Sequence, residues 1–254
     1  MESTVVKSVS NNLVTLTAES GGIYVLAMHN DENRFDLEFM SAIDAVLDHI
    51  DATHPANEPG ALVTYSKHDK IYSNGLRLDI SVKVGHPYFR QYESLLHKLL
   101  TFRMPTVAAI NGHAFAAGLM FALAHDYRVM RSDRGFLCMN EVDMPSPLTP
   151  GMTSIIATKV PHAVTFRNMI LQAHRFSATD ALKNFIVDEI APTSADTITA
   201  ANSLARKWSH KALAGIVYSE LKTQMYVTTA TDLRVCNLGF VERLAGDRVR
   251  KAKL

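Results

Sequence analysis

The pattern of apolar and polar residues changes character along the chain. Short apolar runs bounded by small or polar residues predict strands in the first half. These runs are Leu13–Leu16, Ile23–Met28, Ala61–Tyr65, Met104–Asn111 and Tyr127–Met130. Apolar residues at every third or fourth position predict helices over Leu37–Ile50 and near Tyr88–Thr101. Strands and helices therefore alternate up to about residue 130.

Two segments between these elements are predicted from their small residues. Ser81–Pro87 has no clear period, and we predict a mobile linker there. Gly112–Gly118 is rich in Gly and Ala, which lets backbone approach backbone or a ligand closely. We predict a turn at this point, and it opens an apolar helix over Leu119–Ala124.

From about Thr149 onward the pattern is mostly helical. Ser177 and Thr179 form a cap signal for a helix over Thr179–Asn184. Later helices are predicted over Ser194–Ala212, Ile216–Tyr226 and Asp232–Leu244. The recurring ββα rhythm of the first half predicts an α/β fold built as a spiral of repeated units. We assign residues 1–192 to this core and residues 193–254 to a C-terminal helical region and tail.

Composition excludes several classes of protein. The chain has 254 residues and a net charge of +1, whereas nucleic-acid binding requires a basic face, so no nucleic-acid partner is expected. The two cysteines, Cys138 and Cys236, form no disulfide framework and suit a reducing compartment. No apolar run approaches the roughly 18 residues of a membrane span. His113 has no second histidine at metal-ligand spacing, so we interpret it as structural and expect no metal.

Candidate chemistry gathers around the small-residue turn and one acid. A turn that opens a helix presents free N–H groups at the positive end of the helix dipole, which suits a developing oxyanion. Glu141 follows some way downstream among Met, Val, Cys and Pro, and a carboxylate in such apolar company is a candidate base with a raised pKa. Two alternatives stay open. Glu141 could be an ordinary loop residue, or Asp143 could be the base.

Two blocks of the sequence carry a recognisable signature. The first is PTVAAINGHAFAAG over Pro105–Gly118, followed by HDYR over His125–Arg128 and by Asn140-Glu141. The second is YSNGLRL over Tyr72–Leu78. Together they resemble the crotonase superfamily, the enoyl-CoA hydratase/isomerase family, over roughly Thr15–Asp188.

The chain departs from the family pattern at two positions. Arg77 stands where the family usually has an acid. Ala117 replaces the first residue of the usual Gly-Gly pair.

The resemblance implies a fold and a set of site residues. The fold would be a crotonase-like spiral of ββα units closed by C-terminal helices and assembled as a homotrimer or hexamer. Glu141 would be the catalytic acid–base, and the backbone N–H groups of Leu76 and Ala117 would form an oxyanion hole. Both turns could instead be merely tight connections. The residues implied to bind substrate or CoA are Arg34, Ser73, Asn74, Gly75, Leu76, Ala117, Gly118 and Met120.

One position favours a particular reaction. Family hydratases carry a second glutamate where this chain has Met120. A methionine cannot orient water, whereas double-bond migration needs no water. The resemblance therefore implies a Δ3,Δ2-enoyl-CoA isomerase acting on fatty acyl-CoA thioesters in unsaturated fatty-acid β-oxidation, most like the peroxisomal ones, with no cofactor beyond the CoA of the substrate. The alternatives are a hydratase, hydrolase or lyase of the same fold, or a non-catalytic subunit that binds CoA thioesters.

The last three residues resemble a targeting signal. Ala252-Lys253-Leu254 differs from the peroxisomal S-K-L signal only in its first residue. We predict a peroxisomal location and recognition by the import receptor. The alternative is a solvated basic tail.

Overall fold

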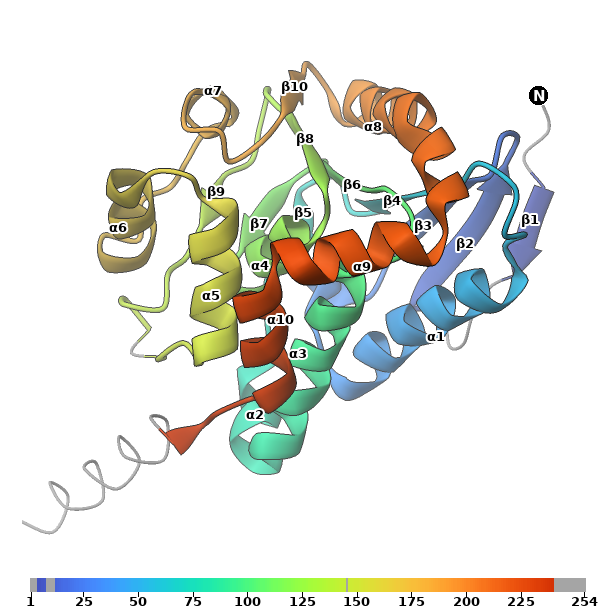
Figure 1. The fold of residues 1–254 in the computed structure, drawn as a ribbon. Coiled ribbons are helices and arrows are strands. Elements are labelled where there is room, and N and C mark those ends of the chain that lie inside the picture. Colours follow the sequence, from blue (N-terminus) through green and yellow to red (C-terminus); the bar gives the residue numbers. More distant parts are fainter. Residues whose placement is uncertain (1–3, 8–11, 145, 240–254) are drawn as a thin grey trace, which may run out of the picture.

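The computed structural model describes residues 4–7, 12–144 and 146–239, and two parallel-rich sheets organise them (Figure 1). The larger sheet has the strand order β1-β2-β3-β4-β6-β8-β10, and the smaller has the order β5-β7-β9. The strands of the larger sheet are β1 Thr4–Lys7, β2 Val14–Glu19, β3 Ile23–Met28, β4 Ala61–Ser66, β6 Thr106–Ile110, β8 Tyr127–Arg131 and β10 Glu189–Ala191. Those of the smaller sheet are β5 Ile71–Ser73, β7 His113–Phe115 and β9 Leu137–Cys138.

The chain repeats one path three times. A strand enters the larger sheet, the next strand enters the smaller sheet, and a helical segment returns to the larger one. The larger sheet receives β4, β6 and β8 in parallel, and the smaller receives β5, β7 and β9 in parallel. The predicted α/β spiral of ββα units is therefore confirmed. The helices are α1 Leu37–Thr53, α2 Leu78–Val84, α3 His86–Leu100, α4 Ala117–Ala124, α5 Pro150–Lys159, α6 Ala163–Leu171, α7 Ala178–Lys183, α8 Ser194–Trp208, α9 Ile216–Met225 and α10 Val227–Val235, with 3-10 turns η1 Asp31–Asn33 and η2 Ser209–Ala214.

Helices cover both faces of the larger sheet. On one face α8 lies against β4, β6 and β8, where its Ala201 and Ala205 pack with Val107 and Val129. On the other face α1 and α3 close over the larger hydrophobic core. Among the described residues, no helix is long and apolar enough to cross a membrane.

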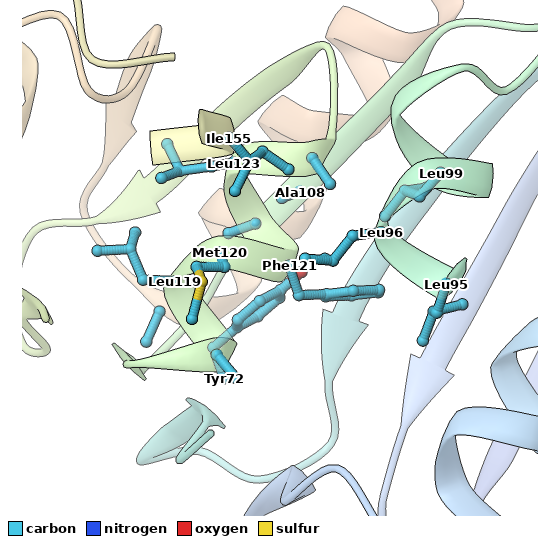
Figure 2. Packing of buried hydrophobic residues seen from close by; sticks show 14 of the residues in the cluster. Tyr72, Leu95, Leu96, Leu99, Ala108, Leu119, Met120, Phe121, Leu123 and Ile155 are labelled. Atoms are coloured by element: carbon cyan, nitrogen blue, oxygen red, sulfur yellow. The ribbon is translucent and has the colours of Figure 1, made fainter. Parts of the chain in front are cut away.

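Helix α4 lies at the centre of the core. All eight of its residues are buried, which is typical of a helix that is apolar all round. Figure 2 shows Met120 and Phe121 of this helix among Tyr72 of β5, Leu96 of α3 and Ile155 of α5. Neighbouring elements thus enclose α4 and fix where its first turn lies.

The predicted linker at Ser81–Pro87 is wrong. Ser81 to Val84 belong to α2, and α3 begins at His86. The Ser81 hydroxyl donates to Leu78 O within the helix (2.9 Å), so this residue supports helix instead of interrupting it. Gly85, with φ 69°, makes the sharp turn between the two helices.

Other boundaries also differ from the prediction. The predicted turn at Gly112–Gly118 contains strand β7, and β10 lies in a region predicted to be mostly helical. Both strands are only three residues long, too short for a readable period. The last predicted helix, Asp232–Leu244, instead ends with α10 at Val235, where Cys236 adopts a left-handed conformation. Residues 240–244 of that prediction lie outside the described residues.

The cap at Ser177 is confirmed. Ser177 and Asp180 form a capping box at the start of α7, because each side chain bonds to the other residue's backbone N–H. The division of the chain at residue 192 stays a prediction.

A buried ion pair fastens α9 to the core. Lys222 Nζ lies 2.8 Å from Asp126 Oδ2 and donates to Phe102 O at 2.9 Å. The same Asp126 oxygen accepts the Thr106 N–H at 2.9 Å, at the start of β6. Burial lowers the pKa of the Lys222 ammonium. One carboxylate thus joins the C-terminal helices to the spiral.

Removing the cation should destabilise the fold strongly. Lys222→Met should lower the free energy of unfolding by about 3–5 kcal/mol, because a buried carboxylate loses its counter-charge. Urea denaturation would measure the change. Arg77→Ala is the control, since its pair with Asp79 is exposed and should contribute little. Equal losses in the two variants would mean that the buried pair has no special role.

Candidate active site

A cavity of about 270 Å³ opens where the ends of β5 and β7 meet the start of α4 and the segment after β9. Its wall consists of Arg34, Asn74, Leu76, Leu78, Phe89, Phe115, Ala116, Ala117, Met120, Asn140, Glu141, Met144, Ser146, Pro147, Leu148 and Met152. Six of the residues predicted from the sequence belong to it, namely Arg34, Asn74, Leu76, Ala117, Met120 and Glu141. Ser73, Gly75 and Gly118 are not on the wall. The structure therefore brings the two sequence blocks and the acid together.

Two glycines behind the wall allow the turn after β5 to contact the first turn of α4. A Cβ atom on Gly118 would lie 2.3 Å from Ser73 O, so no side chain fits between α4 and β5. Gly75 has φ 82°, and a Cβ there would lie 3.1 Å from Phe115 O and 3.4 Å from Ala117 N. The β5 turn and the first turn of α4 are consequently in backbone contact.

Two backbone donors at these turns have no acceptor among the described residues. Phe35 bridges to this turn by donating to Gly75 O and accepting from Arg77 N, which leaves the Leu76 N–H unused. Ala117 is the first residue of α4, where helical N–H groups lack partners within the helix. Because Leu76 and Ala117 both line the cavity, the site can stabilise negative charge on a bound oxygen atom.

The backbone is strained at Ala116, one residue before Ala117, which stands where the family pattern has a glycine. Ala116 has φ 51° and ψ −123°, a conformation that costs a residue with a side chain about 1–3 kcal/mol. Its N–H donates to Cys138 O at 2.8 Å, and Tyr92 Oη donates to Ala117 O at 2.5 Å. Ala117 itself has no positive φ, so alanine at this position is unstrained.

Glu141 also lies on the wall, in a turn after β9. Burial raises the pKa of its carboxyl to about 7, from an ordinary value of 4.5. Its Oε2 is buried and has no hydrogen-bond partner among the described residues. Asp143, the alternative base, is exposed and is not on the wall. A carboxyl with a pKa near neutrality can both take and return a proton.

The polar end of the cavity is formed by Arg34 and Asn74. Arg34 Nε and Asn74 Nδ2 each donate to Glu32 Oε2 at 2.9 Å. About a third of the Arg34 side chain is exposed, and its guanidinium forms an ion pair with Glu32 at 2.8 Å. Arg77, the departure from the family pattern, points elsewhere and pairs with Asp79.

Several wall residues were not predicted. Phe89, Met144, Leu148 and Met152 are apolar residues of this wall. The spacing of apolar residues around Phe89 predicts that one face of this helix is buried. It does not predict which end of the helix lines a cavity.

The arrangement offers acid–base chemistry but no visible metal ligand set. Among the described residues, no group of three or more His, Cys, Asp or Glu side chains could hold a metal ion. Arg34 and Glu141 are the charged residues on the described wall.

Comparison with known proteins agrees with this geometry. The family model for enoyl-CoA hydratase/isomerase matches residues 18–243. Enoyl-CoA delta isomerase 3 of Arabidopsis thaliana is 34% identical over 235 residues, covering 86% of this chain and 97% of that protein. The peroxisomal enoyl-CoA delta isomerase 2 of the same plant is 29% identical, covering 81% of this chain and 89% of that protein.

Solved structures share the fold. The apo structure of an enoyl-CoA isomerase of Mycobacterium tuberculosis superposes with a TM-score of 0.79 at 23% identity, covering 89% of this chain and 96% of that chain. A second structure of the same mycobacterial protein, there named a probable enoyl-CoA hydratase, gives a TM-score of 0.81 at 21% identity, covering 94% of this chain and 99% of that chain. At these identities the likeness shows the fold and not the reaction. The family match and the Arabidopsis relatives together establish that the chain belongs to the enoyl-CoA hydratase/isomerase family.

Proposed function

We propose that the chain is a Δ3,Δ2-enoyl-CoA isomerase that moves the double bond of a 3-enoyl-CoA to the 2-trans position in unsaturated fatty-acid β-oxidation. One observation carries the proposal: Glu141 is the only acid on the described wall, and Met120 stands where hydratases have a second glutamate. Three Arabidopsis thaliana relatives named enoyl-CoA delta isomerases, at 29–34% identity, support it.

The proposed reaction is a proton transfer between two carbons. Ionised Glu141 takes a proton from C2, and the electron pair spreads over the dienolate and the thioester oxygen. The N–H groups of Leu76 and Ala117 stabilise that oxygen, each contributing roughly 3 kcal/mol to the transition state. Protonated Glu141 then returns the proton to C4, which leaves the double bond between C2 and C3. No cofactor other than the CoA of the substrate takes part.

The rest of the wall suits this substrate. Met120, Phe89 and Leu148 present apolar surface to the acyl chain and exclude water from the dienolate. Arg34, which lines the same cavity and is partly exposed, would attract the phosphates of CoA.

Glu141→Gln should abolish most of the activity while leaving the CoA thioester bound. The amide keeps the shape of the side chain but cannot accept the proton, so kcat should fall by at least about a hundredfold with little change in Kd. Conversion of 3-hexenoyl-CoA measures kcat, and calorimetry measures Kd. Near-wild-type turnover by a folded Glu141→Gln protein would remove Glu141 from the mechanism. Asp143→Asn is the matched control and should stay active.

The same residue fixes two pH dependences. The base must be ionised, so kcat/KM should rise with pH and level off above about 7. Because the pKa of Glu141 is raised in the folded state, the neutral carboxyl favours folding. This stabilisation is fully present below about pH 4.5 and is lost as the pH rises through about 7. Glu141→Gln should therefore be more stable than wild type at about pH 8 and equally stable at about pH 4.

Hydration of a 2-enoyl-CoA should be at least about a hundredfold slower than isomerisation, a gap of roughly 2.7 kcal/mol. The reason is that Met120 cannot orient or deprotonate water. Formation of 3-hydroxyacyl-CoA by the wild-type protein is the measurement. Hydration as fast as isomerisation would favour the hydratase alternative, and binding of CoA thioesters without either reaction would favour a non-catalytic subunit.

We propose a homo-oligomer, a trimer or hexamer as the family resemblance implies. Val217, Leu221 and Met225 recur every four residues on α9 and are each more than half exposed, so one side of this helix presents apolar surface to solvent. A Leu221→Glu/Met225→Glu protein should dissociate, whereas Gln224→Glu on the same helix should not. Light scattering would decide, and a stable wild-type monomer at micromolar concentration would contradict the proposal.

We propose a peroxisomal location. Enoyl-CoA delta isomerases 1 and 2 of Arabidopsis thaliana are named peroxisomal, whereas isomerase 3 is not. The proposed signal, Ala252-Lys253-Leu254, lies outside the described residues. Deleting it should leave activity unchanged and move an N-terminally tagged protein to the cytosol, whereas Ala252→Ser should preserve import. Import that persists after the deletion would exclude this tripeptide as the required signal.

A further inference from the structure

The segment that carries Glu141 supplies much of the cavity wall, yet its described residues have few hydrogen bonds to the rest of the molecule. Seven of the sixteen wall residues come from residues 140–152. The hydrogen bonds described for residues 140–148 stay within that segment: Asp143 N and Met144 N donate to Asn140 O, and Ser146 N donates to Glu141 O. The position of Glu141 therefore depends on how the two ends of the segment are held.

The two ends are held by different means. Upstream, Cys138 accepts the Ala116 N–H in the smaller sheet. Downstream, Thr149 is the N-cap of α5, and its Oγ1 accepts the Met152 N–H at 3.1 Å. The same hydroxyl donates to Oε1 of Glu93 on α3. The downstream end is thereby joined to a helix distant in sequence.

Glu93 is built into the contact between three helices. Its side chain is fully buried, and burial raises the pKa of its carboxyl. A Cβ on Gly151 would lie 3.1 Å from Glu93 Oε1 and 3.1 Å from the Leu233 Cα of α10. The absent side chain at Gly151 thus provides room for the carboxyl above the first turn of α5.

Other threonine and serine caps in the chain do not make such a connection. The Thr193 hydroxyl at the start of α8 donates to Asp196 of its own helix, and the Ser177 hydroxyl donates to Asp180 of α7. Those caps stabilise only their own helices. Thr149 instead ties its helix to α3.

Helix α3 also holds the other half of the site. Tyr92, the neighbour of Glu93, donates to Ala117 O at 2.5 Å in the turn that presents the proposed oxyanion donor. Two consecutive residues of one helix therefore contact the two halves of the cavity, the donor turn through Tyr92 and the Glu141 segment through Glu93 and Thr149.

We propose that Glu93 and Thr149 are positioning residues, which act through α3 to set the separation between the Glu141 carboxyl and the N–H groups of Leu76 and Ala117. The inference rests on the proposed isomerase function. Because small displacements of reacting groups reduce rates steeply, loss of this link should lower kcat more than it weakens binding.

The test compares two caps of the same kind. Thr149→Val removes the cap hydroxyl at the cavity, Thr193→Val removes one on α8, and Thr149→Ser restores the hydroxyl. Thr149→Val should lower kcat for 3-hexenoyl-CoA by at least about tenfold with KM nearly unchanged. Thr193→Val and Thr149→Ser should keep the wild-type kcat, although both valine variants should lose some stability.

A second readout is the pH profile. In Thr149→Val the displaced Glu141 carboxyl should be better solvated, so the midpoint of kcat/KM should move below the wild-type value of about 7. A merely structural cap would not move this midpoint. If Thr149→Val does not fold, Glu93→Met, which lacks the acceptor, should show the same loss, and Glu93→Gln, which keeps an oxygen, should not.

The outcomes separate this inference from the function on which it rests. A wild-type protein that does not convert 3-enoyl-CoA rejects the isomerase function itself. In a second outcome the wild-type protein converts 3-enoyl-CoA, and Thr149→Val has the same kcat and the same pH midpoint as Thr193→Val. That result rejects only the positioning role.

Discussion

The close approach of α4 to β5 is the constraint on which the rest of the site depends. With a Cβ at Gly118 only 2.3 Å from Ser73 O, the two backbones can meet only without a side chain between them. This contact places the β5 turn and the first turn of α4 side by side, so that Leu76 and Ala117 line one cavity. The all-apolar α4 then follows as a consequence, since a helix pressed this deeply into the core has no face left for water.

Burial gives the site its chemistry at a cost in stability. The apolar wall raises the pKa of Glu141 to about 7, where one carboxyl can serve as base and then as acid. The same desolvation penalises the ionised form, so the fold is less stable when Glu141 is ionised than when it is neutral. Ala116, held at φ 51°, is a second local cost at the same place. Burial of apolar side chains in the larger hydrophobic core offsets such costs.

Sequence analysis predicted the strands and helices whose burial gives a clear pattern of apolar and polar residues. Strands β3, β4, β6 and β8 are apolar runs because helices cover both faces of the larger sheet, and their spacing revealed the repeated units. The three-residue strand β7 could not be read, because its pairing with β5 and β9 is a long-range property. In the site, Glu141 and Ala117 were reached through motifs of fixed spacing. Phe89 was not, because it reaches the cavity only through the packing of α3.

Glu141 Oε2, which has no hydrogen-bond partner among the described residues, suits the proposed role of a base that exchanges a proton with two carbon atoms. A hydrogen bond to Oε2 would hold the carboxylate in one orientation and would lower its pKa, since donors stabilise the charged form. Leaving a buried polar atom without a partner is unfavourable, and most proteins avoid it. Here Oε2 has no hydrogen-bond partner among the described residues, so no bond at this oxygen offsets the rise in pKa that burial causes. In the proposed mechanism the proton is removed at C2 and returned at C4, and Oε2 would serve both positions without first giving up a hydrogen bond to a described residue.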